Sequence, residues 1–286
     1  MPDEPTRVVR CDRGDVELRF AGPRGADVVL LLHGGHFRAG LPLGEAAFLA
    51  AGHRLLVPSR PGYGHTAPAA GPGPEAFADT LAELCERTGT GTLRAVVGVS
   101  AGGPTAVALA ARHPGLVRSL VLHSARADLP FPDGAARIAA RVAFTPRAEA
   151  ATWAASGAFL RRFPGAGLRS VLGPLSTLPA GRVLADLTGA ECAELVDVLS
   201  RMRSGAGFAA DLRERVDPGP ARAVRVPALV VASRTDGQVR FAHAERWAAL
   251  VPGAVLAESP ALSHLLWYGS GAAETARLTE RFLAAA

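Results

Sequence analysis

The sequence Ala-Val-Val-Gly-Val-Ser-Ala-Gly occupies residues 95–102 and contains the pattern Gly-x-Ser-x-Gly. An apolar run leads into this pattern, and an alanine-rich segment with helical spacing, residues 102–113, follows it. A strand that turns sharply into a helix needs glycines here, because side chains at those positions would clash. Such a turn exposes Ser100 at the edge of a sheet, before a helix N-terminus that favours negative charge. The alternative interpretation is an ordinary glycine-rich turn with a solvated serine.

Apolar runs and helical patterns alternate along most of the chain. Short runs rich in Val, Leu and Ala predict buried strands, which we place at 28–32, 54–57, 93–99, 117–122, 228–232 and 254–257. A weaker alternation at 16–20 predicts an earlier strand. Helical spacing predicts helices at 75–87, 102–113, 242–250 and 274–283. This alternation predicts an α/β fold with a mostly parallel sheet and crossover helices.

The alternation breaks in the middle of the chain. Residues 128–220 show no convincing buried strand, and their helix-like segments lie at 135–142, 148–160, 190–201 and 208–216. We therefore predict a core formed by residues 1–127 and 221–286, with residues 128–220 inserted as a helical cap. A cap over the carboxyl ends of the strands would enclose a substrate pocket. Four aromatic residues of this segment either line that pocket or pack the helices: Trp153, Phe159, Phe163 and Phe208.

Two residues complete a candidate catalytic set with Ser100. Asp236 follows the run at 228–232, and His264 follows the last predicted strand. A serine hydroxyl becomes a strong nucleophile when a histidine takes its proton, and a carboxylate fixes the tautomer of that histidine. Asp128, just after the run at 117–122, is the fallback acid. The alternative roles are a turn-forming residue for Asp236 and a loop-packing residue for His264.

A His-Gly-Gly-His segment follows the apolar run at 28–32. An oxyanion hole in this setting takes one N–H from that loop and one from the residue after the nucleophile. The predicted donors are therefore the N–H groups of Gly35 and Ala101, with His36 as a weaker candidate. His36 and Trp267 are possible substrate contacts, and the first histidine of the segment is expected to bond within its own loop.

Composition excludes several classes of protein. The 286 residues are 49% hydrophobic and include three cysteines, which argues against a disordered chain, a disulfide scaffold and a multi-cysteine metal site. All 31 basic residues are arginine, so lysine-based chemistry is excluded. The arginines are scattered among acids, so we expect no nucleic-acid partner despite a net charge of +5. We further expect no membrane span, no secretory signal and a cytoplasmic location. The sequence does not define the oligomeric state.

These motifs resemble those of the α/β-hydrolase-fold serine hydrolases over nearly the whole chain. The resemblance is carried by the segments 33–35, 60–64 and 98–103 together with Asp236 and His264. It implies a sheet of about eight strands with a cap after the sixth, and a triad of nucleophile Ser100, acid Asp236 and base His264. The loop at 58–64 departs from the family pattern through Pro58 and Pro61, but we expect that loop to be structural.

The resemblance implies hydrolysis of an ester, thioester or lactone of a small molecule through an acyl-serine intermediate, with no cofactor and no metal. The corresponding class is the carboxylic-ester hydrolases (EC 3.1.1). The alanine- and arginine-rich composition is typical of a GC-rich bacterium. Carbon–carbon bond hydrolysis, iminopeptidase activity and acyl transfer on the same fold stay open. A binding protein without turnover is the alternative from another class.

Overall fold

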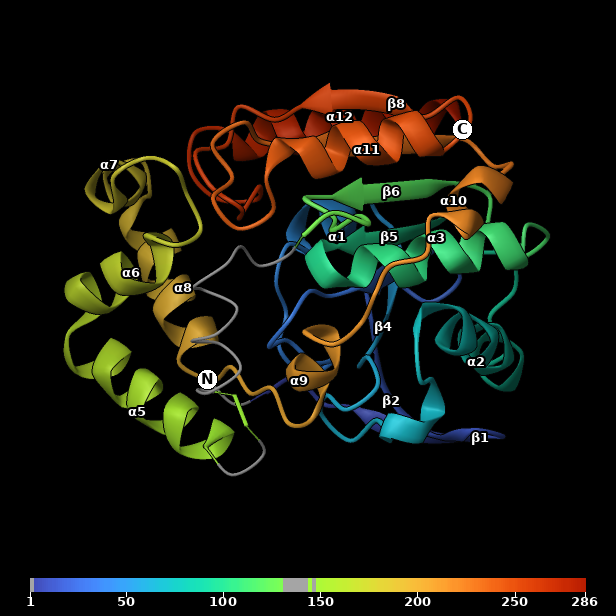
Figure 1. Ribbon diagram of the computed structural model, residues 1–286, viewed down its shortest axis with the longest axis horizontal. Coiled ribbons are helices and arrows are strands. Elements are labelled where there is room, and N and C mark those ends of the chain that lie inside the picture. The colour runs from blue at the N-terminus through green and yellow to red at the C-terminus, as the bar shows by residue number, and fades with distance from the viewer. Residues whose placement is uncertain (1–2, 131–143, 146–147) are drawn as a thin grey trace.

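The computed structural model describes residues 3–130, 144–145 and 148–286. Its described part contains an eight-stranded sheet with the order β1-β2-β4-β3-β5-β6-β7-β8 (Figure 1). The strands are β1 (Arg7–Cys11), β2 (Gly14–Ala21), β3 (Val28–Leu32), β4 (Arg54–Pro58), β5 (Ala95–Val99), β6 (Leu120–His123), β7 (Ala228–Ala232) and β8 (Val255–Glu258). β1 and β2 pair antiparallel, β2 runs antiparallel to β4, and the remaining neighbours are parallel. The predicted α/β architecture is confirmed.

Helices cover both faces of this sheet. The core helices and turns are α1 (Ala46–Ala50), η1 (Pro68–Ala70), α2 (Pro74–Arg87), η2 (Ser100–Gly102), α3 (Gly103–Arg112), α10 (Gly219–Ala223), α11 (Phe241–Leu250) and α12 (Ala272–Ala285). Side chains of the central strands alternate between two apolar clusters. Leu30 and Val96 pack with α2, α3 and α11, whereas Leu31 and Val97 pack with α1 and α12. This two-sided burial explains why the central strands are apolar throughout.

The described residues between β6 and β7 are mostly helical, and we refer to helices α5 to α9 and their connections as the insertion. These helices are α5 (Glu149–Arg162), α6 (Pro164–Leu172), α7 (Ala180–Ala185), α8 (Gly189–Leu199) and α9 (Gly207–Asp211). α5 to α8 lie together on one side of the sheet domain (Figure 1). They share an apolar cluster that includes Leu160, Leu172 and Leu195 and that also takes in Phe37 and Leu265 of the core.

Some predicted boundaries were wrong. β6 begins at Leu120 rather than 117, because Val117 forms only an isolated bridge with Leu93. α9 ends at Asp211 rather than 216, where the Asp211 carbonyl accepts a hydrogen bond from the Arg126 side chain instead of from a helical N–H. The sequence missed α6 and α7, and the helix predicted at 135–142 lies outside the described residues.

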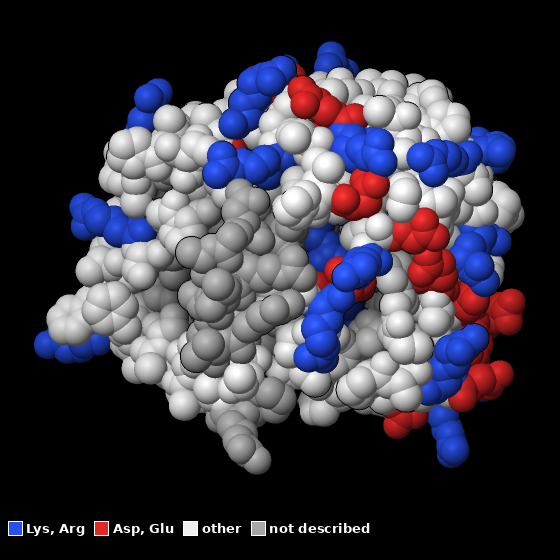
Figure 2. All heavy atoms as spheres, viewed as in Figure 1, with Lys and Arg blue, Asp and Glu red and all other residues white. Residues whose placement is uncertain are grey.

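The surface and the helices bear on two further expectations. On the face seen in Figure 2, arginines are spread over many elements and acidic side chains lie among them. Among the described helices, none combines the length and the apolar character that a membrane crossing requires. The absence of a nucleic-acid partner and the cytoplasmic location stay predictions.

Candidate active site

Ser100 lies in a strained turn between β5 and α3. Its φ of 51° falls in the left-handed region that residues other than glycine rarely adopt. The glycines on either side are required by space. A Cβ on Gly102 would lie 2.4 Å from the Leu32 carbonyl oxygen, and one on Gly98 would lie 2.7 Å from the Ala106 Cβ. The strand, the short 3₁₀ turn η2 and the helix therefore form the sharp elbow that the sequence predicts, and backbone strain of this kind clusters at functional sites.

The predicted acid and base form a hydrogen-bonded pair. His264 Nδ1 lies 2.7 Å from Asp236 Oδ2, and both side chains are buried. The other oxygen, Asp236 Oδ1, accepts from the backbone N–H groups of Gln238 and Val239, each at 2.8 Å. An ionised carboxylate can only accept, so His264 donates from Nδ1 and its Nε2 is left free to act as a base. Asp236 thus fixes both the orientation and the tautomer of His264.

The fallback acid has a different partner. Asp128 forms a bidentate ion pair with Arg246 of α11, at 2.8 and 2.7 Å. This pair lowers the pKa of Asp128 through its hydrogen bonds to Arg246. The structure therefore joins Asp236, and not Asp128, to His264.

A backbone segment of the insertion bonds to both loops that carry this pair. The Leu175 carbonyl accepts from the N–H of Gly237 at 3.2 Å and from the N–H of His264 at 2.8 Å. Thr177 N–H donates to the Thr235 carbonyl at 2.8 Å. A Cβ on Gly237 would lie 2.7 Å from the Ser176 carbonyl carbon, so only glycine fits there. Sequence reasoning missed this contact, because backbone hydrogen bonds place no demand on residue type apart from Gly237.

The His-Gly-Gly-His loop after β3 lies directly against Ser100. A Cβ on Gly34 would lie 2.9 Å from Ser100 Cβ and 3.4 Å from its Oγ. Gly35 is equally confined, because its Cβ would lie 3.0 Å from the Phe208 ring. Ala101, which would supply the second N–H, is buried in η2 beside the serine. The two predicted oxyanion donors therefore come from segments that meet at Ser100.

His33, the first histidine of that loop, contacts acidic and basic groups beneath the site. Its Nε2 lies 3.3 Å from Glu45 Oε1, and Arg19 forms hydrogen bonds to both oxygens of the same carboxylate. Burial opposes ionisation of Glu45, but contacts with His33 and Arg19 lower its pKa. The His33 carbonyl also accepts from Arg60 at 2.9 Å. Its partners thus lie outside the His-Gly-Gly-His segment, so the expectation that it bonds within its own loop was wrong, and its structural role stays a prediction.

The loop at 58–64 is held by a buried ion pair with the insertion. Arg60 forms two hydrogen bonds to the Asp211 carboxylate, at 2.8 and 2.7 Å, and the Tyr63 hydroxyl donates to the same group at 2.6 Å. Asp211 and Arg60 are each 6% exposed. Asp211 thus raises the pKa of Arg60 against the opposing effect of burial. These contacts suit a structural loop, and that role stays a prediction.

The two predicted substrate contacts lie in different surroundings. His36 turns toward the insertion, with its Nδ1 2.7 Å from Ser204 Oγ. Trp267 lies against Gly44, and its indole N–H donates to His123 Nδ1 at 3.2 Å. Trp267 also lines a cavity of about 600 Å³ that Arg19, α1, α12 and α8 border. A direct contact of either residue with substrate stays a prediction.

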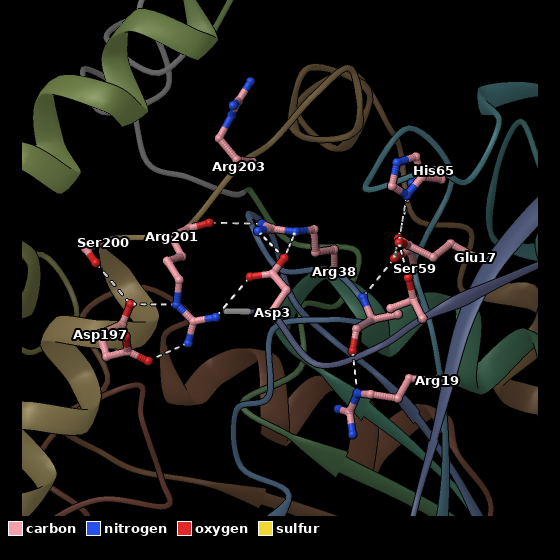
Figure 3. Close-up of polar contacts among 12 residues, drawn as sticks. Asp3, Glu17, Arg19, Arg38, Ser59, His65, Asp197, Ser200, Arg201 and Arg203 are labelled. Carbon is pink, nitrogen blue, oxygen red and sulfur yellow. Dashed lines mark hydrogen bonds and ion pairs between the residues drawn. The ribbon is translucent and has the colours of Figure 1, made fainter. Parts of the chain in front are cut away.

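A surface ion-pair network connects Arg38, which follows the His-Gly-Gly-His segment, to the insertion. The Asp3 carboxylate lies between Arg38 and Arg201, as Figure 3 shows. It accepts from Arg38 at 2.6 Å and from Arg201 at 2.9 Å. Arg38 also donates to the Arg201 carbonyl at 3.0 Å, and Arg201 pairs with Asp197 of α8 at 2.5 Å.

In the described part of the chain, no group of three or more His, Cys, Asp or Glu residues is placed to hold a metal ion.

Comparisons with known proteins agree with this architecture. The family described as alpha/beta hydrolase fold matches residues 27–270. An uncharacterized hydrolase of Bacillus subtilis (strain 168), YcgS, is 30% identical over 275 residues, which cover 95% of this chain and 96% of the relative. An alpha/beta hydrolase fold protein from Nakamurella multipartita superposes with a TM-score of 0.78 at 24% identity, covering 98% of this chain and 99% of that one. The enol-lactonase from Burkholderia xenovorans LB400 gives a TM-score of 0.70 at 21% identity, covering 97% and 100%. The chain therefore belongs to the α/β-hydrolase fold family.

Proposed function

We propose that this protein is a serine hydrolase that cleaves an ester, thioester or lactone of a small molecule through an acyl-serine intermediate. The observation that carries the proposal is the 2.7 Å bond between His264 Nδ1 and Asp236 Oδ2. This pair lies at the same sheet edge as the strained turn of Ser100, because β5, β7 and β8 are parallel and all three residues follow strand ends. The named hydrolase relative and the enol-lactonase of the same fold support it.

The chemistry follows from the roles of these groups. His264 Nε2 takes the proton of Ser100 Oγ, which attacks the substrate carbonyl, while Asp236 stabilises the imidazolium. The N–H groups of Gly35 and Ala101 stabilise the oxyanion of the tetrahedral intermediate. His264 then protonates the leaving alcohol or thiol. Water, deprotonated by His264, attacks the acyl-serine, and Ser100 leaves with the proton to release the acid. The proposed reaction needs no cofactor and no metal.

The insertion has the role of a cap in this proposal. Residues 128–220 would enclose the substrate over the strand ends, with Trp153 and Phe208 in its inner, aromatic part. Both are buried, at 8% and 6% exposure, whereas Phe159 and Phe163 lie exposed on its outer surface. An aromatic inner wall favours substrates with an apolar acyl or alcohol group.

Turnover of a substrate panel tests the proposal. Wild-type protein and Ser100→Ala are compared on p-nitrophenyl esters, acyl thioesters and lactones of graded chain length. We expect at least one class to be hydrolysed by the wild type, with kcat lower by about 10³-fold or more in the variant. Turnover that survives in a folded Ser100→Ala protein would exclude the acyl-serine mechanism. Tight ligand binding without turnover would instead favour a binding protein.

A further inference from the structure

The residue after the proposed oxyanion donor has a strained backbone. His36 has a φ of 70°, in the left-handed region, and directly follows Gly35. Such a conformation is strained in a residue other than glycine and persists only where neighbouring groups impose it. The His36 carbonyl accepts from the Arg203 N–H at 3.3 Å. Because His36 is covalently joined to Gly35, the groups that hold His36 also restrain the backbone of Gly35.

The groups that hold the His36 ring all come from the insertion. Ser204 Oγ lies 2.7 Å from His36 Nδ1 and accepts from the Trp153 indole N–H at 2.8 Å. Ser204 is fixed in turn, because its backbone N–H donates to Glu149 Oε1 at 2.6 Å. The His36 ring packs against Phe208 and Trp153, with centroid distances of 4.0 and 4.8 Å. One side chain of the oxyanion loop is thus enclosed by α5, α9 and the turn before α9.

The hydrogen bonds in this cluster suit a neutral ring whose Nδ1 accepts. An indole N–H can only donate, so the Ser204 hydroxyl accepts from Trp153, and its own O–H is available to donate to His36 Nδ1. Burial lowers the pKa of His36 to about 4, so the imidazole is neutral at physiological pH. Phe208 contacts the backbone as well, because its ring would lie 3.0 Å from a Cβ on Gly35. Ring and backbone are therefore held together.

We propose that His36 is a positioning residue that couples the insertion to the oxyanion hole, through its bond to Ser204. The inference rests on the proposed function. Displacement of the insertion, or loss of the Ser204 hydroxyl, lets the loop relax and turns the Gly35 N–H away from the developing oxyanion. Because that charge exists only in the transition state, the effect falls on kcat and leaves KM nearly unchanged.

Four variants separate the parts of this coupling. Ser204→Ala removes only the hydroxyl that bonds to the ring. His36→Gly keeps the left-handed backbone accessible but removes the ring, whereas His36→Asn keeps both the backbone tolerance and a polar atom near the Nδ1 position. Ser170→Ala changes an exposed serine of α6 and is the matched control. For each protein, kcat and KM are measured on an ester that the wild type hydrolyses, together with the thermal midpoint.

We expect kcat to fall by about tenfold or more in Ser204→Ala and in His36→Gly, with KM within about twofold. We expect His36→Asn to recover most of kcat and Ser170→Ala to match the wild type. A rise in KM with unchanged kcat would identify His36 as a substrate contact and overturn the proposal. A lower thermal midpoint with unchanged kcat would show that His36 only stabilises the fold, and it would also overturn the proposal. A wild type with no turnover and no reaction with a fluorophosphonate would instead overturn the proposed function.

Discussion

His123, the last residue of β6, is held in a setting that accepts only the neutral form of its ring. It is 1% exposed, and Nδ1 accepts from the Trp267 indole at 3.2 Å. Its Nε2 lies 3.0 Å from Thr279 Oγ1, whose own proton is donated to the Thr275 carbonyl. Nε2 must therefore carry the proton, and a second proton on Nδ1 would face the indole N–H. Protonation of His123 would break its bond to Trp267, which lies three residues after His264.

The structure gives the sign and size of the resulting pH dependence. Burial lowers the pKa of His123 from 6.5 to about 4. Between these values the unfolded chain binds a proton that the folded protein does not. The stabilisation from neutral His123 is therefore complete above pH 6.5, decreases as the pH falls from 6.5 to 4, and is lost below that range. It is about 3 kcal/mol in total, most of which is lost between pH 7.5 and pH 4.5.

Urea unfolding at pH 7.5 and pH 4.5 tests this reasoning in the wild type and in His123→Asn. The amide oxygen of asparagine can accept from Trp267, but the residue does not titrate. We expect the free energy of unfolding to fall by about 2–3 kcal/mol less in the variant than in the wild type. His36 and the carboxylates titrate in both proteins, so their effects cancel. Equal losses in the two proteins, within about 0.5 kcal/mol, would refute the account of His123.

Three further predictions concern the site and its support. In Asp236→Asn, kcat should fall by about 10⁴-fold because the catalytic tautomer of His264 is lost. In Asp128→Asn, kcat should stay at the wild-type value. Steady-state kinetics on an ester that the wild type hydrolyses will measure both. Equal losses in the two variants would contradict the assignment of the acid. In Gly34→Ala, the new Cβ would press on Ser100 Cβ at 2.9 Å. Steady-state kinetics should therefore show a lower kcat, while thermal unfolding should show a midpoint close to that of the wild type. In Asp211→Asn, loss of the buried partner of Arg60 should lower the free energy of unfolding by about 3–5 kcal/mol in urea titrations at pH 7.5, and a change below 1 kcal/mol would refute it.

The fold and the contact between Asp236 and His264 could be predicted from the sequence, and the triad roles stay predictions. The elbow at 98–102 carries its own signal, because glycines and an apolar strand are both needed to place Ser100 there. Asp236 follows the buried strand β7. His264 follows β8, and the prediction that this strand is buried was wrong, because Val255 and Leu256 are exposed. Parallel strands bring such positions to one edge of the sheet, where the structure joins the two side chains.

The contacts between the insertion and the core could not be predicted. The Leu175 carbonyl accepts from the N–H groups of Gly237 and His264 and so bonds to both loops that carry the acid and the base. A backbone acceptor of this kind does not require a particular residue type, so the sequence does not reveal it. Asp211 and Arg60 are 151 residues apart, so their pairing follows only from packing. Ser204 is one of several serines near glycine, and its place beside His36 depends on how α5 and α8 pack. Long-range packing of this kind has no periodic pattern in the sequence.

Ser100 is the activated nucleophile of the proposed mechanism. Covalent labelling measures its reactivity without a substrate having to be known. Wild-type protein and Ser100→Ala are incubated with a fluorophosphonate, and the intact mass of each is measured. The account predicts one adduct per wild-type chain and none on the folded variant. A small sulfonyl fluoride, tested in parallel, reaches a serine that a closed insertion would shield from the larger reagent. A folded wild type that reacts with neither reagent, or a Ser100→Ala protein that is labelled equally, would contradict the account.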